Sequence, residues 1–154
     1  MLESKYQKFY DEIVKKIKKE KIFTDKLHTL AYGTDASFYR LIPKIVIKTD
    51  NAKEVQDIIE LSNSMNLSIT FRAGGTSLSG QAISDSILVI TSRNFSNFKI
   101  ANDASYISLQ PALTGAQVNG LLARYSKKIG PDPASINAAM IGGIAANNAS
   151  GMCC

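Results

Sequence analysis

The stretch FRAGGTSLSGQ, residues 71–81, constrains the fold of this chain more than any other. It lies between two short runs rich in β-branched residues, LSITFR and SILVIT, and each run predicts a β-strand. A plain turn needs one or two small residues, whereas nearly every residue here is small or carries a neutral hydrogen-bond donor. Paired glycines also let the backbone adopt positive φ and approach another group closely. The stretch therefore predicts either a ligand-binding loop or a long glycine-rich turn.

Three phosphate-binding devices can be compared with this loop. A P-loop has lysine after its last glycine, where this chain has Gln81. A dinucleotide fingerprint runs into a helix, whereas a strand follows here. The third device is a nest of backbone N–H groups around Gly74 and Gly75, with Arg72 as a nearby charge. Hydroxyl donors without lysine, and without an acidic motif for Mg²⁺, suit a diphosphate; a turn with no ligand remains the alternative.

A second stretch of small residues, AAMIGGIAANNASG, covers residues 138–151 and follows GPDPAS. It contains paired glycines, alanines and asparagines, and its side chains are too small to fill a hydrophobic core. Such a surface lets backbone approach a flat object while Asn and Ser supply hydrogen bonds at its edge. The alternative is tight helix packing through small residues. Two separate Gly-Gly segments favour a large planar cofactor over packing alone.

The periodicity of the chain predicts α+β organisation. Apolar residues at helical spacing predict a helix over residues 4–20, within an N-terminal helical extension of residues 1–31. A βαβ unit follows, with its helix opened by Asn51 and Glu54 as a capping box and an inner stripe of apolar or small side chains. The stripe consists of Val55, Ile58, Ile59 and Ser62. The predicted strands are residues 44–49, 67–72, 86–91 and 106–111, and a last helix over 115–128 begins with Thr114 and Gln117 and ends at Gly130.

Composition excludes several classes of protein. With 45% hydrophobic and 20% charged residues the chain is typical of soluble globular proteins, and no apolar run approaches the roughly 20 residues of a membrane helix. The N-terminus lacks a secretory leader, so a cytoplasmic location is expected. The net charge of +5 is concentrated in residues 15–21, which fits the solvated end of a helix better than a nucleic-acid or membrane surface. Cys153 and Cys154 are neighbours and are not expected to form a structural disulfide.

These motifs resemble those of a known family. RAGGTSLSGQ, followed by GPDPASINAAMIGGIAANNASG, is similar to the FAD-binding domain of the vanillyl-alcohol oxidase (PCMH-type) flavoproteins, in the branch of D-lactate dehydrogenase and glycolate oxidase. YGTDASFY ahead of PKIVIKT resembles the same branch. The resemblance covers residues 32–154. It implies a small βαβ subdomain at about 41–80 and a second, mixed or antiparallel subdomain with helices at about 81–154, truncated at the C-terminus.

The resemblance also implies contacts with FAD. The pyrophosphate would be wrapped by residues of the glycine loop, namely Arg72, Ala73, Gly74, Gly75, Thr76, Ser77, Gly80 and Gln81. Three residues would lie along the ribityl chain and flavin, namely Pro131, Asp132 and Ser135. The isoalloxazine and adenosine side would be approached by Gly142, Gly143, Ala146, Asn147, Ser150 and Gly151. Relatives that bind FAD covalently carry His where this chain has Thr76, so binding is expected to be non-covalent.

The implied function is oxidation of a small D-2-hydroxy acid, of the D-lactate or glycolate type, by hydride transfer to FAD and onward transfer to an unknown acceptor. The alternatives are another flavoenzyme of the same fold, of the enolpyruvyl-sugar reductase or alkyl-ether lipid synthase type, and a basic nucleic-acid or membrane-surface module. The catalytic residues are expected outside this chain, which alone should be inactive. No metal site is expected, and His28 has no evident carboxylate partner. NNASGMCC resembles relatives that add an iron–sulfur module, and association with the inner membrane face is a further expectation.

Overall fold

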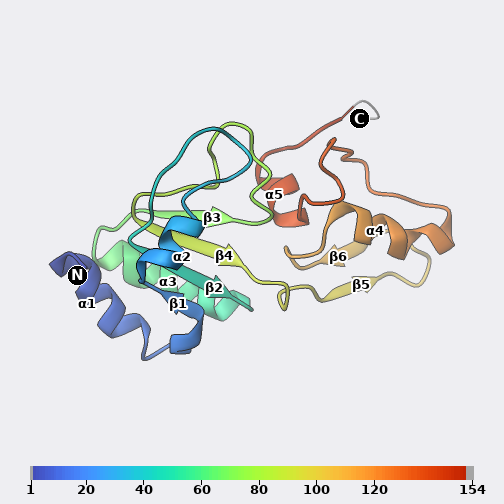
Figure 1. Cartoon of the computed structure of the whole chain (residues 1–154). Helices are drawn as coiled ribbons and strands as arrows, with labels where there is room; N and C mark the ends of the chain where they lie inside the picture. The colour runs from blue at the N-terminus through green and yellow to red at the C-terminus, as the bar shows by residue number, and fades with distance from the viewer. Residues whose placement is uncertain (1, 152–154) are drawn as a thin grey trace. The chain divides into compact units, whose positions relative to one another are not determined.

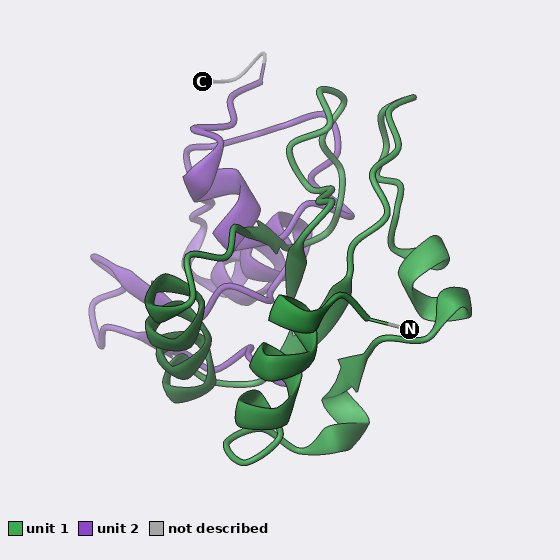
Figure 2. Cartoon of the chain, turned by 90° about the vertical axis from the view of Figure 1, so that its left-hand side faces the viewer, with its two compact units in different colours: residues 1–91 green, residues 92–154 purple. Residues whose placement is uncertain are grey.

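The computed structural model describes residues 2–151, which form two compact units that divide between Thr91 and Ser92 (Figure 2). Unit 1 contains a four-stranded sheet in the order β1-β2-β4-β3 (Figure 1). Its strands are β1 (Ile22–Phe23), β2 (Ile45–Thr49), β3 (Ile69–Arg72) and β4 (Ile87–Thr91). β2, β4 and β3 run parallel, and β1 pairs antiparallel with β2. Its helices are α1 (Ser4–Ile13), α2 (Lys26–Ala31) and α3 (Ala52–Ser64).

The central strands β2 and β4 are apolar on both faces, as expected of parallel strands covered on both sides. Ile45, Ile47, Ile87 and Val89 join the larger core, in which α1 and α3 pack side by side on one face of the sheet (Figure 1). Val46, Leu88 and Ile90 form a smaller cluster on the other face, against Phe23 and Tyr32. The period-two alternation of strands thus divides each run of apolar residues between two cores.

The N-terminal residues pack into unit 1, whereas the sequence led us to expect a separate extension. Tyr6, Phe9 and Ile13 of α1 are buried in the larger core, and β1 is an edge strand of the sheet. The helix predicted over residues 4–20 ends at Ile13, although Ile17 still reaches the core. A run of lysines three and four residues apart follows, and like charges at that spacing disfavour a helix. A short 3-10 helix, Lys19–Lys21, then leads into β1.

The helix of the predicted βαβ unit is confirmed as α3. The side chain of its N-cap residue Asn51 accepts a hydrogen bond from the Glu54 N–H at 3.0 Å. The expected inner stripe is correct for Ile58 and Ser62 and wrong for Ile59, whose side chain is exposed. β3 does not pair with β2, because β4 lies between them. β4 is therefore part of the first unit, and the division falls after Thr91 rather than near residue 80.

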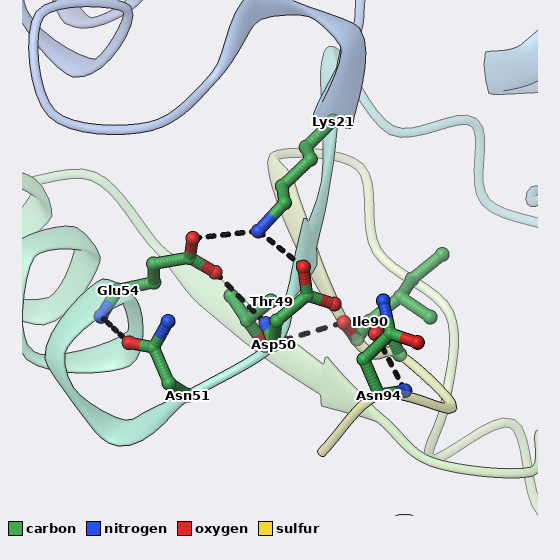
Figure 3. Close-up of polar contacts among 8 residues, drawn as sticks. Lys21, Thr49, Asp50, Asn51, Glu54, Ile90 and Asn94 are labelled. Carbon is green, nitrogen blue, oxygen red and sulfur yellow. Dashed lines mark hydrogen bonds and ion pairs between the residues drawn. The ribbon is translucent and has the colours of Figure 1, made fainter.

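A charged cluster fixes the junction between β2 and α3 (Figure 3). The Lys21 ammonium pairs with the carboxylates of Asp50 and Glu54, the latter at 2.6 Å, and Glu54 also accepts the Asp50 N–H at 2.8 Å. Burial, the largest influence, lowers the pKa of Lys21, but the hydrogen bonds to Asp50 and Glu54 outweigh it and raise that pKa overall. The cluster attaches the end of the N-terminal segment to the sheet.

Unit 2 is smaller and contains a two-stranded antiparallel sheet. Its elements are β5 (Phe98–Ile100), β6 (Ile107–Leu109), α4 (Gly115–Leu122) and α5 (Ile141–Ala146). The capping box of α4 is confirmed, with Thr114 and Gln117 bonded reciprocally. The helix predicted to reach Lys128 ends at Leu122, and a 3-10 turn stops at Ser126 with a left-handed φ of 54°. The helix α5 was not predicted, and neither was the strand β5.

Candidate functional site

The glycine loop follows the carboxyl end of β3, as predicted. Because β3 and β4 are neighbouring parallel strands, residues 73–86 must return the chain from one end of the sheet to the other. They do so without a helix, so no helix N-terminus is present in this segment to attract an anion. Residues 82–84 and Ser86 are buried, which holds the far end of the loop to the sheet. The remaining residues of the loop, 74–81, are exposed or half-buried.

The backbone of the glycine loop is left-handed at two positions. Gly75 has a φ of 67° and Gly80 a φ of 72°, so each occupies the left-handed region that favours glycine. Gly74, expected to share that role, is not in that region. Within the described chain, the N–H groups of Thr76, Ser77 and Leu78 have no hydrogen-bond partner. These three successive donors are available to an anion.

The side chains of Ser77 and Gln81 are bonded to each other within the loop. The Ser77 hydroxyl donates to the Gln81 side-chain oxygen at 3.1 Å and accepts the N–H groups of Ser79 and Gln81 at 3.1 and 3.2 Å. These bonds close the turn after the free donors. In this conformation Ser77 therefore shapes the loop through its hydroxyl and can contribute to anion binding through its main-chain N–H.

Three consecutive residues, Thr34, Asp35 and Ala36, hold the loop at its start, middle and end. The Thr34 carbonyl accepts from Arg72 Nη1 at 2.6 Å, and the Ala36 N–H donates to the Gly75 carbonyl at 3.0 Å. Asp35 Oδ2 accepts the Ala82 N–H at 3.3 Å. We call residues 34–36 the clamp. In the sequence, residues 34–37 (TDAS) contributed only to the family resemblance, and no contact was predicted for them.

The guanidinium of Arg72 lies beneath the loop. A Cβ on Gly75 would lie 2.6 Å from Arg72 Nη2, so the guanidinium packs directly against the glycine. It also lies 5.8 Å from the centre of the Tyr32 ring. Burial lowers the pKa of Arg72, and the nearby Asp35 carboxylate partly opposes that shift. Arg72 therefore supports the loop from below in this structure.

The environment of Asp35 favours its charged form. Its Oδ1 accepts hydrogen bonds from the Ser37 N–H at 2.9 Å and the Ser37 hydroxyl at 2.5 Å. Burial would raise the pKa of Asp35, but the hydrogen bonds from Ser37 and Ala82 and the attraction of Arg72 lower it overall. Asp35 is thus an ionised, half-buried carboxylate at neutral pH.

A pocket of about 290 Å³ lies between the segment after the clamp and the end of the glycine loop. Tyr39, Arg40 and Leu41 form one side of it, and Ser79, Gly80 and Ile83 the other. The Tyr39 ring rests on Gly80, where a Cβ would be 3.0 Å from the ring. The volume of this pocket is at the small end for ligand sites, so the pocket can receive part of a cofactor.

The other predicted cofactor-binding residues lie in unit 2. They form two groups in the sequence, at 131–135 and at 142–151, and the structure brings these groups together. Gly142, Gly143 and Ala146 are on α5, with Asn147 as its C-cap. Gly142 packs against Pro111, which would be 2.6 Å from a Cβ there. Gly151 lies so close to the Asp132 carbonyl that any side chain would collide with it. The ends of the two motifs, near Asp132 and Gly151, are therefore in direct contact.

His28 is a structural residue of α2. Its Nδ1 lies 2.8 and 2.9 Å from the two carboxylate oxygens of Asp25, and its ring stacks on Phe23 with 4.4 Å between ring centres. The expected lack of a carboxylate partner is therefore wrong.

Within residues 2–151, no group of three or more His, Cys, Asp or Glu side chains could hold a metal ion. In the same part of the chain, no helix is long and apolar enough to cross a membrane. Cys153 and Cys154 lie outside the described residues.

Comparisons with known proteins agree with the resemblance. A family model described as FAD binding domain matches residues 43–154. D-2-hydroxyglutarate dehydrogenase of Haemophilus influenzae is 28% identical over 84% of this chain, which spans 13% of that protein. Glycolate oxidase subunit GlcD of Escherichia coli is 28% identical over 83% of this chain, which spans 27% of it. The chain thus corresponds to a small part of the length of these relatives.

Among solved structures, an alkyldihydroxyacetonephosphate synthase matches 95% of this chain with a TM-score of 0.81 and 18% sequence identity. The chain covers 30% of that structure. At this identity the likeness concerns the fold alone, and it confirms the α+β fold of PCMH type that the motifs indicated.

Proposed function

Because this chain belongs to the FAD binding domain family, we propose that its glycine loop holds the diphosphate of FAD. The observation that carries the proposal is the row of three N–H donors at residues 76–78, beside Gly75 with its left-handed backbone. A Cβ at Gly75 would fill the space against Arg72, so only glycine keeps this shape. The small-residue stretch at residues 138–151 and the segment 131–135 before it keep their expected roles beside the flavin, which rest on the resemblance of their motif.

We propose further that FAD is held without a covalent bond, since Thr76 stands where covalent relatives carry His. The whole protein is expected to bind FAD, and titration of FAD with the protein should quench the flavin fluorescence. Acid precipitation of the complex should release all flavin into the supernatant. Flavin that remains with the washed precipitate would contradict non-covalent binding. Absence of any FAD binding, with ADP also failing to bind, would contradict the diphosphate site itself.

The reaction that we propose is oxidation of a small D-2-hydroxy acid. Two curated relatives, named for D-2-hydroxyglutarate and glycolate, act by name on 2-hydroxy acids. Bound FAD supplies a two-electron acceptor for the hydride on the substrate's α-carbon, and the hydroxyl proton must go to a base. Residues of this chain bind and orient the cofactor. No base is assigned to the described residues, since His28 is engaged with Asp25 far from the loop in sequence.

The substrate class can be tested with dye reduction by the whole protein, using D-2-hydroxyglutarate, D-lactate and glycolate in parallel. Turnover of at least one, at a rate about 100-fold above its L-enantiomer where one exists, is expected. Reduction by none of them would favour another flavoenzyme of the same fold, such as an ether-lipid synthase.

An iron–sulfur module elsewhere in the protein remains part of the proposal, on the likeness of NNASGMCC alone. Iron analysis of the whole protein would test it.

A further inference from the structure

The contacts of the clamp suggest a role for a residue that the family likeness does not assign. The clamp touches the glycine loop at three points, at Arg72, Gly75 and Ala82, all of them distant from the clamp along the chain. Two of these contacts use the backbone of Thr34 and Ala36, so they depend on the conformation of residues 34–36. Asp35 sets that conformation, because its Oδ1 closes a turn onto the N–H and hydroxyl of Ser37.

Asp35 also makes the third contact itself. Its second oxygen accepts the N–H of Ala82, where the loop returns to the sheet. One carboxylate therefore both shapes the clamp and anchors the end of the loop, and it faces the half-buried Arg72 on which Gly75 rests. The free N–H groups of residues 76–78 lie between the points that the clamp holds.

We propose that Asp35 is a positioning residue, which sets the affinity for diphosphate by holding the glycine loop in the conformation that directs its N–H groups to one anion. The proposal rests on the proposed FAD site, because it concerns the same loop. Asp35 need not touch the cofactor; it acts through Ala36, Arg72 and Ala82. Pre-organised donors bind more tightly than donors that must first be ordered, which is why the effect appears in affinity.

The chain supplies a matched control for this proposal. Residues 103–105 repeat the sequence Asp-Ala-Ser, and Asp103 Oδ1 accepts the N–H and hydroxyl of Ser105 at 3.1 and 2.8 Å. The same pair of Asp–Ser hydrogen bonds therefore occurs in unit 2 without the three contacts to the glycine loop. Asp103→Ala removes a turn of this kind, whereas Asp35→Ala removes the turn and the clamp together.

We expect Asp35→Ala to raise the Kd for FAD and for ADP about tenfold, and Asp103→Ala to leave both within about twofold. Asp35→Asn should fall between wild type and Asp35→Ala, because its amide oxygen can still accept hydrogen bonds but its charge is gone. A Kd for Asp35→Ala equal to that of the wild type would overturn the proposal. So would an equal loss of affinity in both alanine variants.

Amide hydrogen exchange of the protein without cofactor tests the clamp separately from the cofactor site. The N–H groups of Ala36 and Ala82 are hydrogen-bonded in the clamp, so both should exchange at least about tenfold faster in Asp35→Ala and unchanged in Asp103→Ala. Faster exchange with no FAD binding by the wild type would support the clamp and refute the proposed function. Unchanged exchange at both amides would refute the clamp even if FAD binds.

Discussion

The variant Gly75→Asp is expected to bind FAD at least about 100-fold more weakly than the wild type. Gly75 has a φ of 67°, a conformation that costs other residues about 1–2 kcal/mol. The new Cβ would lie 2.6 Å from Arg72 Nη2 and would push the guanidinium away from the Thr34 carbonyl. The added carboxylate would also stand beside the N–H groups that are proposed to hold a diphosphate, and like charges repel. Each effect acts on the loop, and together they should abolish measurable binding.

Titration of flavin fluorescence with both proteins measures this change. Gly120→Asp is the matched control, because it adds the same charge at a glycine whose Cβ would meet nothing within 4 Å. The control should retain the wild-type Kd within about threefold. Stoichiometric FAD in purified Gly75→Asp would show that the diphosphate is held elsewhere.

Local signals in the sequence were enough to predict the features that depend on residues close together in the chain. Asn51 and Thr114 cap their helices as predicted, since a cap is made by groups three residues apart. The strand after the glycine loop was also predicted, although its place between β2 and β3 was not. Strand order depends on pairing between distant segments, and the β-branched run of β4 is equally compatible with an edge or a centre.

The helix α5 was missed because it contains Gly142 and Gly143, which disfavour helices on their own. Its packing against Pro111 and the burial of Ile144 override that preference.

The part of the site that sequence reasoning missed is the clamp. Its bonds join residues that are 38 and 47 positions apart, from Arg72 to Thr34 and from Ala82 to Asp35. The local signal, Asp-Ala-Ser, predicts only a turn and occurs again at residues 103–105. The positive φ at Gly75 and Gly80, in contrast, follows from a property of glycine that the sequence itself displays. Loop composition therefore indicated the segment that is proposed to bind an anion, and the tertiary structure shows what holds this segment.

A chain that begins at Tyr32, without residues 1–31, is not expected to fold into unit 1. The family model begins at residue 43, and the periodicity of the sequence suggested that residues 1–31 form a separate extension. Those residues instead supply five buried side chains to the larger core, namely Tyr6, Phe9, Ile13, Ile17 and Ile22. Burial of such side chains contributes about 1.5–3 kcal/mol each, so their loss approaches the 5–15 kcal/mol that stabilises a typical domain.

The truncation also removes Lys21 and exposes one edge of the sheet. Asp50 and Glu54 would then face each other without their shared cation, and β2 would lose its pairing with β1. Circular dichroism and urea unfolding of the truncated and intact chains would measure the result, with a cooperative transition expected only for the intact chain. Phe9→Ala gives a graded version, for which a loss of about 3–5 kcal/mol is expected, and Phe38→Ala is its control because that ring is 88% exposed. If the truncated chain unfolds cooperatively at the urea midpoint of the intact one, residues 1–31 are an accessory segment and the buried contacts of α1 contribute little to stability.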